Sequence, residues 1–165
     1  MKKFLFILLS VPMLAWPASI GLSYNDWDGI DSDGIAIEFD TTFGSNMAFD
    51  FDYHDVDASG VSINVHMMHL GYAFGDLSEG AFHIGLTNMD ADYYDDGSGE
   101  TGPTIGYTRR ASSGGDFSIK FSDMNDLDTI LEIDYVTNSG ISLGLMDDGE
   151  GSVWTIGYTF HLGGS

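Results

Sequence analysis

The chain contains no cysteine among its 165 residues. This absence excludes a disulfide scaffold, a thiolate zinc site, a cysteine nucleophile and a lipid-modified cysteine anchor. Basic residues are also scarce, with five Lys and Arg against 26 Asp and Glu and a formal net charge of −21. Since no basic stripe exists to neutralise phosphates, we expect no nucleic-acid partner.

A strong excess of one charge is typical of disordered chains, which are also poor in aromatic and β-branched residues. Here 43% of the residues are hydrophobic and 13% are aromatic. The composition therefore predicts a folded protein, and its length predicts one domain.

The N-terminus has the pattern of a secretory signal peptide. Lys2 and Lys3 precede an apolar run over residues 4–16, and the small residues Ala18 and Ser19 follow. The run is shorter than the 20 or so apolar residues that a spanning helix needs. We expect a signal peptide over residues 1–19 and a single domain over 20–165. No later apolar run is long enough for a transmembrane helix.

Beyond this segment, apolar and polar residues alternate with a period of two, which predicts strands with one apolar face. The phase slips at Met67–Met68, where we expect a β-bulge. No helical period competes with the alternation. Ten strands are expected, or eight if short runs such as 103–108 or 141–146 are not strands. The apolar runs are 20–24, 35–43, 47–53, 61–74, 82–86, 105–107, 117–121, 131–135, 141–145 and 154–162.

Two architectures accept such strands. A soluble sandwich points the apolar faces inward. An up-and-down membrane barrel points them outward, towards lipid, and keeps polar residues inside. Because alternation with period two fits both the sandwich and the barrel, the connections between strands must distinguish the two architectures.

Acidic residues gather on every second connection. Seventeen of the 26 lie on the odd-numbered connections, and three on the even-numbered ones. Outer-membrane barrels have short periplasmic turns and longer outer loops. Here the longest connection, 89–102, is odd and the shortest, 44–46, is even. The odd connections are 25–34, 54–60, 89–102, 122–128 and 146–151, and the even ones are 44–46, 75–80, 109–116 and 137–140.

Aromatic residues of the apolar faces gather near the even connections. Such sorting is typical of an aromatic girdle at a membrane interface, and a sandwich gives no reason for it. The sequence therefore favours an all-β, up-and-down antiparallel transmembrane β-barrel. The aromatic residues are Phe43, Tyr72, Phe74, Phe82, Tyr107, Phe117, Tyr135 and Phe160.

The last run carries a polar-x-Gly-x-x-aromatic-x-apolar pattern in Thr155, Gly157, Phe160 and Leu162. It resembles the terminal assembly signal of bacterial outer-membrane barrels, although residues 163–165 follow the last apolar position. The chain as a whole resembles the small outer-membrane barrels of the OmpA-transmembrane-domain and OmpX-like class, in pattern and not in residue identity. The resemblance implies a porin-like, Gram-negative outer-membrane protein with the barrel assembly machinery and outer-membrane lipids as partners.

The polar faces would line the barrel interior, or lumen. Side chains there can form a hydrogen-bonded plug, and their surplus of acids over bases leaves a weakly cation-permeable pore as an alternative. No acid is expected on an apolar face, and the assumed bulge turns every His inward. The expected lumen residues are Glu38, Asp40, Asp50, Asp52, His54, His66, His69, His83, Lys120, Glu132 and Asp134.

Carboxylates also cluster on two odd connections, together with glycines. Carboxylate oxygens suit Ca²⁺ and Mg²⁺, although the twelve-residue EF-hand spacing is missing. A solvated acidic rim is the simpler interpretation, and weak divalent binding is the alternative. The candidate ligands are Asp26, Asp28, Asp31, Asp33, Asp90, Asp92, Asp95 and Asp96.

No motif of an enzyme stands out. A rim hydrolase would have to use His54, with Ser59 and Ser62 close in sequence, and no nucleophile elbow or phosphate loop is present. We expect a monomeric, non-enzymatic barrel without a resident cofactor. A secreted or periplasmic β-sandwich that binds divalent cations, and an outer-membrane hydrolase, are the alternative functions.

Overall fold

The described part of the chain forms ten strands in a computed structural model. The residues described are 18–28, 32–44, 46–58, 61–92, 98–110, 115–124, 129–149 and 151–162. The strands are β1 (Ala18–Trp27), β2 (Ser32–Phe43), β3 (Met47–Ala58), β4 (Val61–Phe74), β5 (Ala81–Asp92), β6 (Ser98–Arg109), β7 (Asp116–Asp123), β8 (Thr129–Val136), β9 (Ile141–Asp147) and β10 (Ser152–Leu162).

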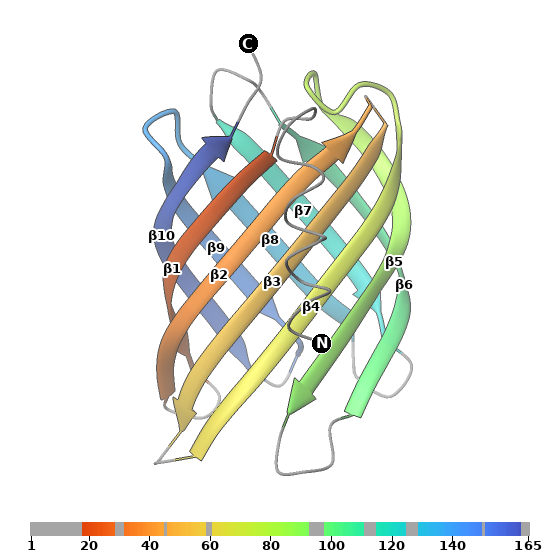
Figure 1. Ribbon diagram of the computed structural model, residues 1–165. Coiled ribbons are helices and arrows are strands. Elements are labelled where there is room, and N and C mark those ends of the chain that lie inside the picture. The colour runs from red at the N-terminus through yellow and green to blue at the C-terminus, as the bar shows by residue number, and fades with distance from the viewer. Residues whose placement is uncertain are drawn as a thin grey trace, which may run out of the picture.

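The sheet is a closed up-and-down barrel (Figure 1). Each strand pairs antiparallel with its neighbours in sequence, and β1 closes the ring against β10, from Ala18 opposite Leu162 to Trp27 opposite Val153. The predicted barrel and its ten strands are confirmed, and a sandwich is excluded. β1 starts two residues before the boundary that we expected. Residues 1–17 of the signal peptide expected over residues 1–19 lie outside the described residues.

The described residues include no helix that is both long and apolar enough to cross a membrane.

The strand pairing of β4 contains no bulge. β4 runs in one continuous register along β3, from Val61 opposite Ala58 to Tyr72 opposite Met47. The pairing with β5 is continuous as well. The bulge expected at Met67–Met68 is therefore wrong. The apolar residues change face at this point of β4. The inward Val65 and Met67 are apolar towards one end of the barrel, and the outward Met68 and Leu70 are apolar further along the strand.

The odd connections are shorter than predicted, because the strands extend into them. The connection expected over 89–102 is mostly strand, since β5 continues to Asp92 and β6 begins at Ser98. The same holds for 25–34, where β1 ends at Trp27 and β2 begins at Ser32. Loop length therefore does not distinguish the two ends of this barrel.

The outer face of the barrel carries an apolar belt. Among the described residues, twenty large hydrophobic side chains are exposed, and strand register places all of them on the outward face. Exposure reaches 70% at Phe82 and 63% at Phe74. The belt consists of Leu22, Tyr24, Ile35, Ile37, Met68, Leu70, Tyr72, Phe74, Phe82, Ile84, Leu86, Ile105, Phe121, Tyr135, Ile141, Leu143, Trp154, Ile156, Tyr158 and Phe160.

The inner face is mainly polar. Eighteen described polar or charged residues are buried, against 13 hydrophobic ones, and the buried polar set includes Asp50, Lys120 and Glu132. A water-soluble domain would reverse this arrangement, because apolar surface left in water costs roughly 25 cal/mol per Å². Period two along each strand separates the two surfaces, since successive side chains point to opposite faces.

The polarity reverses towards the end of the barrel where the odd connections lie. There the inward side chains form an apolar layer of Val56, Val65, Met67, Met124, Ile130 and Val153, each at most 4% exposed. The outward positions at this end are acidic instead of apolar. They are Asp26, Asp33, Asp55, Asp57, Asp90, Asp123 and Asp147.

We call this section of the barrel the acidic rim. Its inner face is apolar and its outer face is acidic, which is the polarity of a water-soluble barrel. The expectation that no acid lies on the outward face is wrong for the rim. The reason is that the strands continue past the apolar belt into a section whose outward positions are acidic.

The even turns and both ends of the described chain lie at the opposite end of the barrel (Figure 1). Outward aromatic side chains such as Phe74 and Phe82 lie next to the turns at this end. Ring contacts join Phe82 to Tyr107 at 5.3 Å and Tyr158 to Phe160 at 4.8 Å between centroids. The girdle predicted from the sequence lies at this end of the barrel. Phe74 is the last residue of β4, directly before the turn 75–80, and Phe82 is the second residue of β5, directly after it.

The even turn 75–80 folds into the barrel mouth. Its Leu77 is 2% exposed and packs in a cluster with inward Ala48, Ala73 and Ala81. The turn is closed by Asp76, whose Oδ1 accepts hydrogen bonds from the hydroxyl of Ser78 at 2.7 Å and its amide at 2.9 Å. These two donors lower the pKa of Asp76 below its usual value. Leu77 thus caps this end with an apolar side chain.

Candidate functional site: the acidic lumen

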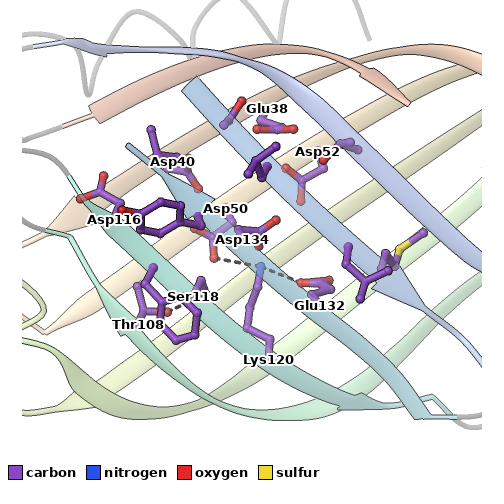
Figure 2. A pocket seen from close by; sticks show the side chains of 18 of the residues that line it. Glu38, Asp40, Asp50, Asp52, Thr108, Asp116, Ser118, Lys120, Glu132 and Asp134 are labelled. Carbon is purple, nitrogen blue, oxygen red and sulfur yellow. Dashed lines mark hydrogen bonds and ion pairs between the residues drawn. The ribbon is translucent and has the colours of Figure 1, made fainter. Parts of the chain in front are cut away.

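The lumen brings together acidic side chains from strands that are far apart in the sequence. β2 supplies Glu38 and Asp40, β3 supplies Asp50 and Asp52, and β8 supplies Glu132 and Asp134 around Lys120 of β7 (Figure 2). Alternation explains their positions, because residues two apart on one strand share a face. These predicted lumen residues all line one cavity.

His66 is an exception to the predicted lumen set, because it faces outward. It lies opposite Tyr53 in the register of β3 and β4, and the two rings meet edge to face at 5.0 Å. It also contacts the outward Phe51. Without a bulge, His66 and His69 lie on opposite faces, so the prediction that both point inward is wrong. Asn64 shares the outward face and accepts a hydrogen bond from the Tyr53 hydroxyl at 2.6 Å.

Two basic side chains extend into the lumen and pair with its acids. The Lys120 ammonium is 2.7 Å from Glu132 Oε2 and 3.6 Å from Asp50 Oδ2. The Arg110 guanidinium pairs with Asp50, lies 3.4 Å from Asp40 Oδ1, and donates to the carbonyl oxygen of Thr41 at 2.7 Å. Asp50 therefore bridges the two cations.

Arg110 reaches this position from the connection between β6 and β7, and its backbone amide donates to the Leu77 carbonyl. The sequence pattern placed Arg110 in a turn, from which it could face the lumen acids beside Lys120, but did not indicate its partners. No spacing signals these partners, because Asp40 and Asp50 are 70 and 60 residues away.

The remaining carboxylates have fewer partners. Glu38 accepts a hydrogen bond from the Ser23 hydroxyl at 2.9 Å. Asp52 and Asp134 make no hydrogen bond or ion pair with any described residue. Seven acidic and three basic residues line the cavity, which leaves a formal excess of four negative charges. One of the three bases, Arg109, is bonded to the Gly115 carbonyl at 2.7 Å in the even turn.

The cavity itself has a volume of about 80 Å³ and extends from Arg110 and Asp116 to the apolar layer at Met67 and Val153. A buried site needs roughly 10–15 Å³ of such space for each water molecule. The cavity therefore has room for about five to eight waters. A charged, hydrated interior that is closed by apolar side chains follows from this geometry.

A second, uncharged network lines the wall formed by β4 to β7. His69 Nδ1 lies 3.1 Å from the hydroxyl of Thr87, which in turn lies 2.7 Å from that of Thr104. Ser122 lies within 3.1 Å of both hydroxyls. A parallel row runs from His83 through Thr108 to Ser118. Sequence reasoning placed both His residues in the lumen but did not identify this hydroxyl ladder.

Inward glycines make room for these polar side chains on the wall. A Cβ added to Gly106 would lie 2.7 Å from His83 Cε1 and from the Ile119 carbonyl oxygen. A Cβ on Gly21 would lie 2.7 Å from Glu38 Oε2. Each of these glycines lies directly opposite the polar residue in the strand register. Glycine on a polar face thus marks where a long polar side chain lies flat against the barrel.

His54 lies inside the barrel and not on its surface. It is 6% exposed, its Nδ1 is 3.2 Å from Asn25 Nδ2, and its ring meets Trp27 edge to face. A rim hydrolase would need this imidazole to be open to substrate. The neighbouring Ser59 and the side chain of Ser62 lie outside the described residues.

The candidate loop ligands are only partly described. Asp26 and Asp33 lie directly opposite each other on the outward face, and Asp57 follows on the next strand. Asp28 and Asp90 are exposed. Asp31, Asp95, Asp96 and the side chain of Asp92 lie outside the described residues. In the described part of the chain, no group of three or more His, Asp or Glu side chains is placed to hold a metal ion directly.

The residues of the predicted assembly signal lie on β10, the strand that closes the barrel. Thr155 lines the cavity, whereas Phe160 is 56% exposed on the outward face. Gly157 has a structural reason to be glycine, because an added Cβ would clash with the Leu22 carbonyl oxygen. Leu162 pairs with Ala18 at the end of the seam.

Comparison with known proteins adds one likeness. No protein-family model and no curated protein matches the chain. Among solved structures, the chain is similar to the crystal structure of Neisserial surface protein A, with 8% sequence identity and a TM-score of 0.38. That match covers 89% of this chain and 96% of the other. At this identity, no residue role is carried over from that protein.

Proposed function

We propose that the protein is a small outer-membrane β-barrel with a structural role and a lumen plugged by charged side chains. The observation that carries the proposal is the reversed polarity of the closed barrel: an exposed apolar belt outside, and buried ion pairs inside. In lipid every strand must pair on both sides, and the closed ring of ten strands satisfies this condition.

The two ends of the barrel support one orientation. The aromatic side chains near the even turns fit the periplasmic interface, and the acidic rim then extends past the membrane on the cell exterior. The expected partners are outer-membrane lipids and the assembly machinery that would read β10. The barrel would be monomeric.

The acidic rim is the proposed contact with anionic lipid headgroups. Asp26, Asp33 and Asp57 lie side by side on adjacent strands, and like charges in that position repel. Weakly bound Ca²⁺ or Mg²⁺ would relieve this repulsion and bridge the rim to lipid phosphates.

A folded barrel is expected to show heat-modifiable mobility. Membrane samples left unboiled in SDS should migrate differently from boiled samples, because a closed ring of paired strands resists detergent until it is heated. The measurement is gel mobility before and after boiling, alongside fractionation of cells. A product found only in the soluble fraction, with one mobility in both lanes, would contradict the proposal.

Conductance through the barrel should be small and cation-selective. Leu77, the ion pairs of Arg110 and Lys120, and the apolar layer obstruct the lumen, while its excess carboxylates repel anions. Planar-bilayer recordings should show steps far below those of sixteen-stranded porins, which hold an open aqueous channel. Large steps, or an anion-selective reversal potential in a salt gradient, would disprove the plugged lumen.

A further inference from the structure

Arg109 is the only Lys or Arg side chain on the outward face of the described part of the barrel. It shares the outward parity of Ile105 and Tyr107 on β6, is exposed, and lies at the end with the even turns (Figure 1). Lys120 and Arg110, the other two such residues of the described chain, pair with acids in the lumen. A plugged, structural barrel has no need of this outward cation.

The Arg109 guanidinium is fixed in place, and only part of it is used. Its Nη2 donates a hydrogen bond to the Gly115 carbonyl oxygen at 2.7 Å. Its Nε and Nη1 make no hydrogen bond or ion pair with any described residue. The exposed Asn138 lies beside the same glycine, since a Cβ added there would be 3.2 Å from Arg109 Nη2 and 3.4 Å from Asn138 Oδ1. The open side of the planar guanidinium matches a phosphate group, which arginine can bind through two N–H donors.

An unpaired acid lies next to Arg109, on the turn 75–80. A Cβ added to Gly80 would lie 3.5 Å from Arg109 Cβ and would clash with the Tyr107 hydroxyl, so the turn packs against the end of β6. Glu79, the preceding residue, is exposed and makes no ion pair with Arg109 or with any other described residue. The two side chains therefore present opposite charges from neighbouring positions without neutralising each other.

These charges lie beside the aromatic side chains of the barrel. Arg109 is directly opposite Phe117 in the register of β6 and β7. The Tyr107 ring contacts Phe82 at 5.3 Å and Phe117 at 6.4 Å between centroids, and Phe82 is 70% exposed. Aromatic belts lie at the level of the lipid headgroups. The patch thus joins a polar edge that can bind a headgroup to an apolar surface that can contact acyl chains.

The pair of charges indicates the class of headgroup. An anionic headgroup would offer a phosphate to Arg109 but would be repelled by Glu79. A zwitterionic headgroup offers a phosphate to the arginine and an ammonium to the carboxylate. We propose that Arg109 and Glu79 bind the headgroup of one glycerophospholipid of the phosphatidylethanolamine class, in the membrane leaflet at the even-turn end. This site rests on the proposed function, because it requires the apolar belt to lie in lipid.

Native mass spectrometry of lipid binding tests the site. The full chain is refolded in octyl glucoside, a detergent without phosphate, in the presence of EDTA, and its heat-modifiable fraction is measured first. Phosphatidylethanolamine, phosphatidylglycerol and diacylglycerol with identical acyl chains are then titrated separately. We expect one phosphatidylethanolamine per barrel, bound at least about fivefold more tightly than either other lipid, because both of its charges have a partner.

Matched variants locate the headgroup. Arg109→Gln should remove the preference for phosphatidylethanolamine over diacylglycerol, and Arg109→Lys should keep part of it because the charge remains. Glu79→Gln should reduce the preference for phosphatidylethanolamine over phosphatidylglycerol. Asp123→Asn makes the same acid-to-amide change on an exposed residue of the acidic rim. Since EDTA removes the divalent cations that a rim contact needs, this control should bind all three lipids as the wild type does.

Several results would overturn the site. Phosphatidylglycerol that binds as tightly as phosphatidylethanolamine would contradict a zwitterionic headgroup. Unchanged affinities in Arg109→Gln, or a loss of binding in Asp123→Asn, would place the lipid elsewhere. A folded wild-type barrel without any lipid preference would also reject the site, and its retained heat-modifiable shift would leave the outer-membrane barrel standing. Absence of that shift would instead contradict the proposed function itself.

Discussion

Replacing Lys120 by methionine should destabilise the barrel by about 3–5 kcal/mol, the typical effect of removing one partner of a buried ion pair. Lys120 is 4% exposed, and its ammonium is the nearest cation to Glu132 and a second cation for Asp50. Methionine keeps much of the length of the side chain and removes the charge. The free energy of unfolding can be measured by urea titration in lipid vesicles, followed by tryptophan fluorescence and by heat-shifted mobility.

Two controls separate lost charge compensation from lost packing. Lys120→Met combined with Glu132→Gln removes both members of the closest pair, and part of the lost stability should return. Arg109→Met removes a cation that is bonded at the turn to Gly115, and it should have a much smaller effect. If Lys120→Met unfolds at the same urea concentration as the wild type, Lys120 does not hold the lumen charges in balance.

Period two was enough to predict the strands, and the sorting of acidic and aromatic residues then favoured a barrel over a sandwich. Runs such as Ile35 and Ile37 on β2 give one apolar face whichever strand pairs with them, so the ten strands followed from local pattern. Glu38 and Asp40 fell inward for the same reason. Alternation is a property of each strand by itself, which is why it is readable without knowledge of the neighbours.

The lengths of the connections and the side of His66 were not readable in the same way. Both errors come from the rim, where the outer face is acidic and the inner face is apolar. The inward Val65 and Met67 look like a continuation of the outward apolar run, so the sequence suggested a bulge that the register of β4 excludes. A period-two pattern reports which face is apolar, and not whether that face points to lipid or to the lumen.

Ion pairing in the lumen also needed the structure. Glu132 and Lys120 are directly opposite in the register of β7 and β8, which a correct strand alignment could predict. Arg110 follows a strand instead of lying within one, and it crosses the barrel to reach β2 and β3. Such a contact depends on how the ring closes, and no local signal in the sequence carries that information.

Replacing Leu86 by arginine should destabilise the barrel in lipid by about 2–4 kcal/mol, the range for a charged residue on the lipid face near the bilayer midplane. Leu86 is 59% exposed on the outward face of β5, lies between Leu70 and Pro103 of the neighbouring strands, and is halfway along β5 from Phe82 to Asp90. The residue makes part of the apolar belt, so arginine there would take a charge into the hydrocarbon. Urea titration in vesicles of defined thickness measures the loss.

Asp90→Arg is the matched control on the same strand and the same face. It lies four residues from Leu86, or about 13 Å along the strand, and its side chain is exposed in the acidic rim. An arginine there should change stability little, because the rim meets water and its other charges are acidic. If the two substitutions had equal effects in vesicles, the membrane-spanning assignment would be wrong. The two positions are expected to differ because the bilayer surrounds the apolar belt and does not reach the rim.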